Sequence, residues 1–495
     1  MASTFNLIRN SKVFFTTNVD ATTGLFKQAT ACTAADSFQL TVLDGFSFSQ
    51  GTNADTVSIS EAGGQAVRGS RSFNTSLNAA EFSFSTYIRP YQASSLVKTE
   101  ESVLWNALLG DQPVSVADIS LAYTGTLTGS VVAGLLTLNA TTITVTGLAV
   151  GDVVNIKGVV GVGANQFNSA VKIVTIGAAT MTAQYLTAPS ASFVAANFGA
   201  TTVTKFSKSA WIEQAAASGD TGFVTAYSEI TTARSNLNQL QKFALVITVD
   251  QVTYALDNCV LDQASIDFGL DGIATIAWTG KAAGIRQLAT STTYAAPSGG
   301  TAGGAGGTIA ITGTANGTIT ASSLSTKYIT NKLSTVALVS QIGGGGTTYT
   351  LALTGGNITI ANNVNYITPN NLGVVNTAIG YYTGNRQVSG SMTAYLRTGS
   401  ANTAGLFADM VAGAASSAET KFALTLAVGG SSNPLRVELY GVGAALQIPT
   451  IDAQAVMSTT INFNLQGTDS VVGTAGAAYD LENTNDLRIR YFSPA

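Results

Sequence analysis

The residue types that usually carry enzyme chemistry are scarce in this chain. It contains no histidine, which removes Ser-His-Asp and Cys-His nucleophile systems, the usual zinc sites and the commonest general base. Asp262, Asp267 and Asp271 have a spacing that imitates a calcium loop, but the liganding Glu and the turn Gly are misplaced. We therefore expect strand-edge and turn residues at these positions, with no catalytic residue, no metal, no cofactor and no enzyme activity.

Glycine and cysteine give no ligand site either. The stretch 299–307 lacks the G-x-x-x-x-G-K-[ST] pattern and a following helix, so it predicts a linker, and 343–346 predicts a hairpin turn. Cys32 and Cys259 have a spacing that fits neither a disulfide framework nor a metal site. We expect two buried free thiols, consistent with synthesis in a reducing cytoplasm.

The charge content excludes some partners. Only 10% of the 495 residues are charged, well below an ordinary soluble protein, and the net charge of −4 comes without a dense basic run. A DNA-reading module needs clustered Lys and Arg for phosphates, so that class is disfavoured. No window approaches about 18 continuous apolar residues, and the N-terminus lacks a secretory signal pattern. We expect no membrane insertion.

Strand-like alternation of polar and apolar residues dominates the chain. Clear cases are AEFSFSTYI (80–88), IATIAWTG (273–280) and TTINFNLQ (459–466), each with one apolar side and one wet, nearly uncharged side. A face without charge fits a strand that is enclosed by protein or lines a wide wet channel, although an ordinary Ser/Thr-rich strand stays open as an alternative. The candidate lining residues are Glu81, Ser83, Ser85, Thr275, Thr279, Ser389, Ser391, Thr393, Asn462 and Asn464.

The chain also repeats itself in order. FNTSLNAAEFSFSTYIR (73–89) matches YYTGNRQVSGSMTAYLR (381–397) without a gap, and KFALVITV from Lys242 matches KFALTLAV from Lys421. Downstream, QASID (263–267) is echoed by IPTID (448–452). Ordered matches of this kind indicate a duplicated β-domain. Two like domains in one chain can occupy two like positions in a ring, so that a trimer imitates a hexamer.

The front of each copy matches more loosely. SKVFFTT (11–17) is echoed by TKYITNK (326–332), and LTVLDGFSFSQ (40–50) by LALTGGNITIAN (351–362). Charges recur at matching positions in Arg89 and Arg397, and in Lys242 and Lys421. These four are either solvated strand ends or partners for an acidic residue of a neighbouring subunit, and we regard them as candidates for inter-subunit charge pairing.

Each copy contains one helical pattern at the same place. The first spans Thr99 to Gly110, with Thr99 as a cap, the acidic pair Glu100–Glu101 in the first turn and an apolar face that includes Trp105. The second spans Asn402 to Gly413, with an apolar face of Leu406, Phe407, Met410 and Val411. Trp105 and Trp278 lie on apolar faces, which favours core packing over ligand stacking.

These patterns predict a mainly β fold with two tandem β-sandwich or barrel domains, each with one short helix, and an inserted small β-domain. The first domain is discontinuous (1–110 and 207–290), because 111–206 contains short β runs of its own and must lie outside the parent domain. Residues 291–324 form a Gly/Ser/Thr-rich linker, and 325–495 form the second domain.

The order of strands, helix, KFAL strand and alternating final strands resembles the tail tube proteins of tailed bacteriophages. In that family six β-sandwich domains form a ring, their inner sheets join into a 24-stranded β-barrel, and rings stack into a tube that carries DNA. A duplicated version occurs in T5-like phages, where three chains supply six domains. An immunoglobulin-like or other β-domain often decorates the outside. The resemblance covers both copies; the insert's position inside the first copy departs from the pattern.

The resemblance implies a structural virion protein, made in the host bacterial cytoplasm and located in the phage tail. Its partners would be copies of itself, the tape measure inside, baseplate and terminator proteins at the ends, and DNA in non-specific passage. The alternative is a phage or bacterial surface adhesin, or a capsid decoration protein, that binds a glycan or receptor through the insert and loops. An adhesin does not need the same polar strand face in both copies, whereas a tube does.

Overall fold

The protein is mainly β, as the sequence predicts, and two α-helices occur among the residues that the structure describes. The helices are α1 (Ser102–Leu108) and α3 (Thr403–Ser416), and a 3-10 turn, η4, covers Asn331–Leu333. The computed structural model describes residues 12–27, 36–43, 45–59, 69–93, 96–110, 119–132, 134–157, 159, 167–185, 205–208, 210–214, 227–231, 240–249, 252–288, 328–340, 347–372, 375–416, 422–448, 450–452, 457–466 and 486–494.

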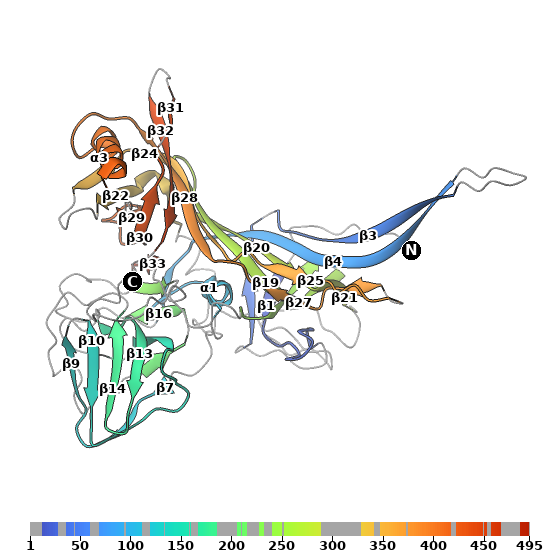
Figure 1. Ribbon diagram of the computed structural model, residues 1–495, viewed down its shortest axis with the longest axis horizontal. Helices are drawn as coiled ribbons and strands as arrows, with labels where there is room; N and C mark the ends of the chain where they lie inside the picture. Colours follow the sequence, from blue (N-terminus) through green and yellow to red (C-terminus); the bar gives the residue numbers. More distant parts are fainter. Residues whose placement is uncertain are drawn as a thin grey trace, which may run out of the picture.

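One long sheet, the shared sheet, runs through both copies of the repeat (Figure 1). Its strands pair antiparallel in the order β3–β4–β20–β19–β24–β28–β32–β31. The first copy supplies β3 (Ser47–Ile59), β4 (Gly69–Tyr87), β20 (Thr275–Ala282) and β19 (Val252–Gly269). The second copy supplies β24 (Leu353–Ala361), β28 (Gln387–Tyr395), β32 (Ser458–Leu465) and β31 (Thr450–Asp452).

Each copy has a second sheet behind the shared sheet. The first back sheet has the order β2 (Ser37–Leu40), β1 (Lys12–Thr16), β18 (Phe243–Val249), the first half of β19, and β21 (Gly284–Leu288). The second back sheet has the order β23 (Thr348–Leu351), β22 (Thr335–Ser340), β29 (Phe422–Val428), β30 (Arg436–Leu446), β33 (Leu487–Phe492), β17 (Tyr227–Thr231) and β16 (Trp211–Gln214).

Two strands of the second back sheet come from the first half of the chain. β17 pairs with β33 from Tyr227 opposite Phe492 to Thr231 opposite Arg488, and β16 pairs with β17. The sequence patterns predict that residues 207–290 belong to the first domain. The domain boundaries stay a prediction, but these two strands extend the sheet of the second copy and tie the copies together.

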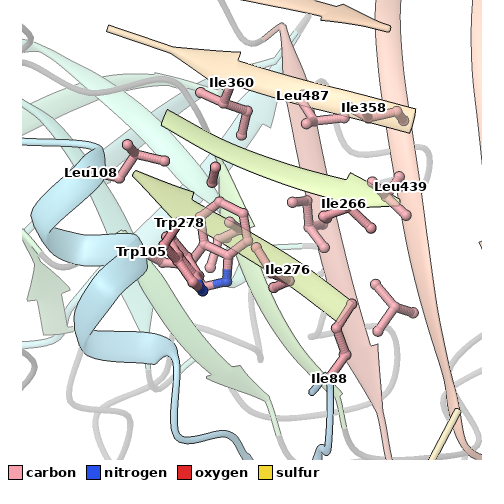
Figure 2. Packing of buried hydrophobic residues seen from close by; sticks show 14 of the residues in the cluster. Ile88, Trp105, Leu108, Ile266, Ile276, Trp278, Ile358, Ile360, Leu439 and Leu487 are labelled. Carbon is pink, nitrogen blue, oxygen red and sulfur yellow. The ribbon is translucent and has the colours of Figure 1, made fainter. Parts of the chain in front are cut away.

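The main core lies between the shared sheet and the two back sheets. One continuous cluster of buried residues includes members of both copies. Figure 2 shows its centre, where Ile276 and Trp278 of β20 lie between α1 and apolar side chains from β24 and the second back sheet. The apolar side of the alternating strands therefore faces this core, as predicted.

Helix α1 forms where the sequence predicts it, although its start differs. Every side chain from Ser102 to Leu108 is buried, and Gly110, with a φ of +79°, ends the helix by leaving the right-handed region. The residue before the helix is Glu101, which makes no side-chain capping bond, so the predicted Thr99 cap and the acidic first turn are wrong. Burial between two sheets, rather than a cap, holds this short helix.

Helix α3 confirms the predicted second helix and corrects its end. Leu406 and Met410 are buried, but Val411 is 52% exposed and does not belong to the apolar face. The helix also continues through Gly413 to Ser416. A helical Gly costs only about 1 kcal/mol relative to Ala, and the alanines that follow favour helix.

The strand pairing also corrects one predicted echo between the copies. β1 pairs with β18 and β2, and the strand with the same neighbours in the second copy is β22, which pairs with β29 and β23. TKYITNK (326–332), the predicted equivalent, instead contains Ile329, whose carbonyl accepts from Ala274 N, and the start of η4. The echo of 40–50 in 351–362 is confirmed, since β2 and β3 correspond to β23 and β24.

The inserted residues form a separate sheet with its own core cluster (Figure 1, lower left). Its order is β7 (Ile119–Ser120), β15 (Lys205–Ser207), β12 (Val153–Lys157), β13 (Ala170–Ile176), β14 (Thr180–Tyr185), β10 (Leu135–Asn139) and β9 (Thr128–Val132). A further pair joins β8 (Ala122–Thr124) to β11 (Thr142–Thr144).

Short strands complete the fold. β5 (Tyr91–Ala93) pairs with β6 (Leu96–Lys98), and β25 (Asn365–Ile367) pairs with β27 (Gly380–Tyr382). β26 (Asn376–Thr377) runs parallel to β4, so the 362–386 segment of the second copy lies along the first.

Three glycines in the shared sheet lie directly opposite phenylalanines of the neighbouring strand. The pairs are Gly280 with Phe82, Gly356 with Phe268, and Gly390 with Phe463. A Cβ on Gly390 would lie 2.5 Å from the Phe463 ring and 2.2 Å from the Asn357 carbonyl oxygen. Because each glycine has no side chain, the ring of the phenylalanine opposite it can lie over the backbone of the glycine strand.

Replacing Gly390 by Ala should lower the free energy of unfolding by about 2 kcal/mol, because the sheet must shift to admit the methyl group. Urea denaturation of the unassembled chain measures this. Gly380→Ala in β27 is the matched control, since no atom lies within 4 Å of its added Cβ. Equal denaturation midpoints for the two variants would show that the close packing at Gly390 contributes nothing.

Candidate functional site

The structure brings all the predicted lining residues onto one side of the shared sheet, which we call the polar face. Ser83 on β4 lies opposite Thr279 on β20, and Ser391 on β28 lies opposite Asn462 on β32. The register extends these pairs into rows across both copies. Two of the rows are Ser85–Ala277–Ser265–Thr359–Ser389–Asn464 and Thr275–Asp267–Asn357–Ser391–Asn462.

Several residues of the polar face were missing from the predicted set. They belong to strands β3, β19 and β24, and to the rest of β32, and the same alternation that identified the others would have found them. FSFSQ (46–50), ASIDFG (264–269) and NITIA (357–361) each alternate small polar with apolar residues. The missed residues are Ser47, Ser49, Gln263, Ser265, Asp267, Asn357, Thr359 and Thr460.

Hydroxyl and amide groups on this face bond to one another. The Ser47 and Ser83 hydroxyl oxygens are 2.8 Å apart, and those of Thr393 and Thr460 are 3.2 Å apart. Ser391 donates from its hydroxyl to Asn357 Oδ1 at 2.9 Å. Cross-strand bonds of this kind stabilise the sheet and leave short, neutral side chains toward solvent.

Charge is sparse on the polar face. Glu81 and Asp267 are exposed carboxylates, and Lys281 lies opposite Glu81 in the register. The ammonium of Lys281 donates to the Val364 carbonyl oxygen at 2.7 Å, while Asp262 Oδ1 accepts from Val364 N at 2.6 Å. Lys281 and Asp262 therefore hold the 362–386 segment of the second copy against the first.

The described residues contain no group of three or more His, Cys, Asp or Glu side chains that could hold a metal ion. The three aspartates with calcium-like spacing do not form one site. Asp262 accepts a hydrogen bond from the backbone N–H of Val364, Asp267 lies on the polar face, and the Asp271 side chain is 96% exposed. No described helix is long and apolar enough to span a membrane.

Comparison with known proteins agrees with this geometry. The chain is 24% identical over 474 residues to the tail tube protein pb6 of Escherichia phage T5. The matched region covers 95% of this chain and 74% of pb6. The predicted resemblance to a T5-like tail tube protein is confirmed. No protein-family model matches the sequence.

The predicted charge candidates have different surroundings. Arg89 is buried, with its guanidinium 3.6 Å from Glu100 Oε1 and over the rings of Tyr87 and Tyr328. Its acidic partner thus belongs to the same chain. Lys242 and Arg397 are exposed, and their pairing with a neighbour stays a prediction. Lys421 lies outside the described residues.

The start of α1 contains a buried carboxyl group, that of Glu101, which the sequence pattern placed in the first turn of the helix. Glu101 is 2% exposed; Thr99 donates a hydrogen bond to its Oε2, and its Oε1 has no partner. Burial raises the pKa of Glu101 to about 8, the negative charge of Glu100 adds to the rise, and Arg89 opposes it. The group is therefore a neutral acid at pH 7.

The remaining candidates pack in the core or lie outside the described residues. Trp105 and Trp278 are fully buried and meet edge to face with ring centroids 4.8 Å apart, which confirms core packing. Cys259 is a buried free thiol, as predicted, and its burial raises its pKa well above the ordinary value. Cys32, the 299–307 and 343–346 glycine stretches, and the linker 291–324 are outside the described residues.

Proposed function

We propose that three copies of this chain close into a pseudo-sixfold ring, and that the rings stack into a phage tail tube that conducts DNA. One observation carries the proposal: a polar, charge-poor face continues in register across both copies of the repeat. Two unrelated domains in an adhesin would have no reason to align such a face. The similarity to the pb6 tail tube protein supports the same structural role.

The number of strands in the shared sheet fits this ring. Four strands from each copy, and six copies in three chains, make the 24 strands that the resemblance implies. β3 and β31 lie at the two ends of the sheet, and among the described residues each pairs on one side only. Joining these edges between chains closes a barrel and removes both free edges.

In the closed ring the polar face lines the channel. Its hydroxyls and amides are neutral, the ammonium of Lys281 is engaged by the Val364 carbonyl oxygen, and the few carboxylates repel DNA weakly. The helices lie outside the barrel, because α1 packs on the apolar side of β20 and β19 through Trp105. DNA passes along the wall without sticking, and no catalytic step is involved.

The β3–β4 hairpin supplies a contact between stacked rings. Its outer part, residues 51–57 and 69–75, is exposed along its length and includes Val57 and Phe73, each more than half exposed. Figure 1 shows this two-stranded ribbon extending away from the rest of the chain. An isolated two-stranded ribbon is marginally stable in water, so we expect it to lie against a copy in the next ring.

The remaining assignments follow from the ring. Residues 1–110 with 207–290, and residues 325–495, form the two tube domains, joined by the 291–324 linker. The 111–206 insert decorates the outside threefold. The tape measure occupies the lumen before ejection, baseplate and terminator proteins contact the tube ends, and assembly follows synthesis in the host cytoplasm. Lys242, Lys421 and Arg397 supply charge pairs between subunits.

Negative-stain electron microscopy of the purified protein at high concentration tests the proposal. We expect tubes with a central channel and threefold decoration around a near-sixfold lumen. Deleting residues 111–206 should remove the decoration and leave the channel. Globular, unassembled monomers at the same concentration would count against the ring.

A charge on the polar face should make the channel wall bind DNA. In Asn462→Arg, each ring gains three cations next to the lumen, at an exposed position of β32. We expect tubes that retain short double-stranded DNA in a sedimentation assay at 50 mM salt, with about tenfold or greater loss of binding at 200 mM because counterion release drives the contact.

Thr128→Arg on the insert is the matched control, since it adds the same charge at an exposed position away from the shared sheet. Its tubes should behave like those of the unchanged chain. Equal DNA retention by the two variants would place Asn462 outside the lumen.

The adhesin or decoration protein remains the second candidate, and the separate core of the insert favours it. A folded module on a loop is suited to receptor binding. Binding of a glycan by the full chain, lost when residues 111–206 are deleted, combined with a failure to form tubes, would support this function instead.

A further inference from the structure

The junction between the two copies is a template for the junction between chains. At this internal junction β19 pairs antiparallel with β24, with Ser265 opposite Thr359 and Asp267 opposite Asn357. Thr359 donates from its hydroxyl to Ser265 Oγ at 3.2 Å, so the two side chains meet across the strands. If the copies are equivalent in a ring, the same pairing must recur where one chain meets the next.

The strand register identifies which residues of the second copy correspond to β19. Gly280 of β20 lies opposite Phe82, and Phe463 of β32 lies opposite Gly390, the residue that matches Phe82 in the repeat. β20 and β32 are therefore equivalent, with Ala277 matching Thr460. Since Ala277 lies opposite Ser265 and Thr460 opposite Thr450, Ser265 corresponds to Thr450.

By the same step Asp267 corresponds to Asp452, because Asp267 lies opposite Thr275 and Asp452 opposite Ser458. This agrees with the sequence echo of QASID in IPTID. The edge strand β31 thus stands where β19 stands in the first copy.

The other edge is identified in the same way. Asn357 of β24 lies opposite Ser391, and Ser47 of β3 lies opposite Ser83. Ser83 and Ser391 occupy matching positions in the repeat, so Ser47 corresponds to Asn357 and Ser49 to Thr359. β3 therefore occupies the same position in the sheet of the first copy as β24 occupies in the second.

We infer that neighbouring chains join by antiparallel pairing of β31 in one chain with β3 in the next, with Thr450 opposite Ser49 and Asp452 opposite Ser47. The inference rests on the proposed ring and names the residues that close it. The occupant of each free edge is a second copy of this chain.

The two junctions differ in one respect. β19 is unbroken, whereas the second copy changes from β30 to β31 between Leu446 and Thr450, with Pro449 in the sequence between them. Proline lacks an N–H to donate, and short or interrupted strands are common devices that blunt a free edge. The junction between chains therefore forms fewer backbone bonds than the one within a chain, and a ring separates first between chains.

Paired cysteines test the register. In a Cys32→Ser background, Ser49→Cys with Thr450→Cys should form disulfides between chains in assembled, oxidised tubes, seen as covalent dimers and trimers on a non-reducing gel. Directly opposite residues of an antiparallel pair have Cα atoms about 4.5–5.5 Å apart, within the range that a disulfide spans. The internal pair Ser265→Cys with Thr359→Cys is the matched control and should oxidise within one chain.

A second variant tests for a register between β3 and β31 that is shifted by one residue. Ser49→Cys with Ile451→Cys places the thiols on opposite faces and should give no disulfide between chains. The inference is overturned if the internal pair oxidises and the Ser49/Thr450 pair does not, or if the slipped pair forms covalent trimers instead. A tube map at side-chain resolution reads the same register directly. Tubes without these bonds would leave the ring in place and reject this register, whereas an unchanged chain that forms no tubes would reject the ring itself.

Discussion

Replacing Trp278 by alanine is expected to lower the free energy of unfolding by about 4 kcal/mol, the range typical of a large aromatic removed from a core. Trp278 is fully buried in the middle of β20, and its indole N–H donates to the Thr86 hydroxyl at 3.0 Å. The variant leaves a cavity behind the polar face and an unpaired hydroxyl within it. Urea denaturation of the unassembled chain measures the loss.

The same substitution should weaken the attachment of α1. The Trp105 ring meets Trp278 edge to face at 69°, and its own indole N–H donates to the Tyr491 hydroxyl at 2.8 Å. A double-mutant cycle with Trp105→Ala should give a coupling of about 1 kcal/mol, because aromatic pairs in contact are not additive. Tyr382→Ala, at a 55% exposed ring, is the control and should change stability little. A Trp278→Ala loss no larger than the control's would contradict this account of the core.

Local alternation was enough to predict the strands of the shared sheet and their faces. A strand has a side-chain period of two, so AEFSFSTYI already separates Phe82 and Phe84 from Ser83 and Ser85 without knowledge of any partner. The repeat then placed the same face in the second copy. The polar face could therefore be predicted almost residue by residue, and its missing members on β3, β19 and β24 follow the same pattern.

Pairing between distant segments could not be read in this way. β16 and β17 lie before the KFAL strand of the first copy, yet they extend the second back sheet through β33. The local sequences WIEQ and YSEIT do not identify β33 as the pairing partner. Residues with a preference for strands can pair with any available strand edge. The mistaken echo of SKVFFTT has the same cause: composition matched TKYITNK, but hydrogen-bonded neighbours make β22 the equivalent strand.

The largest difference between expectation and structure is at Glu101. Acidic residues are favoured in the first turn of a helix, and that rule predicts Glu101 there. The fold instead encloses Glu101 between α1 and the second back sheet, near Tyr491, whose pKa is raised by burial and by Glu101. Local preference could not reveal this, because burial depends on β33, which lies almost 400 residues later in the sequence.

Glu101→Gln should stabilise the chain, and the gain should grow with pH. The folded pKa of about 8 lies above the ordinary value of 4.5, so the folded state holds the proton more tightly than the unfolded state. The stability from this protonated group is complete below pH 4.5 and is lost as pH rises through about 8. Glutamine resembles the neutral acid and has no proton to lose. The difference between variant and unchanged chain should be roughly 2 kcal/mol at pH 6 and on the order of 5 kcal/mol at pH 9.

Denaturation of the unassembled chain at pH 6, 7.5 and 9 gives the two curves. The groups that face Glu101 are Glu100, Arg89 and Tyr491. Glu81→Gln is the matched control, because it removes an exposed carboxylate of the same type from the polar face and should leave the pH profile parallel to that of the unchanged chain. A parallel profile for Glu101→Gln as well would mean that Glu101 is ionised in the folded chain, and that water or a cation reaches the start of α1.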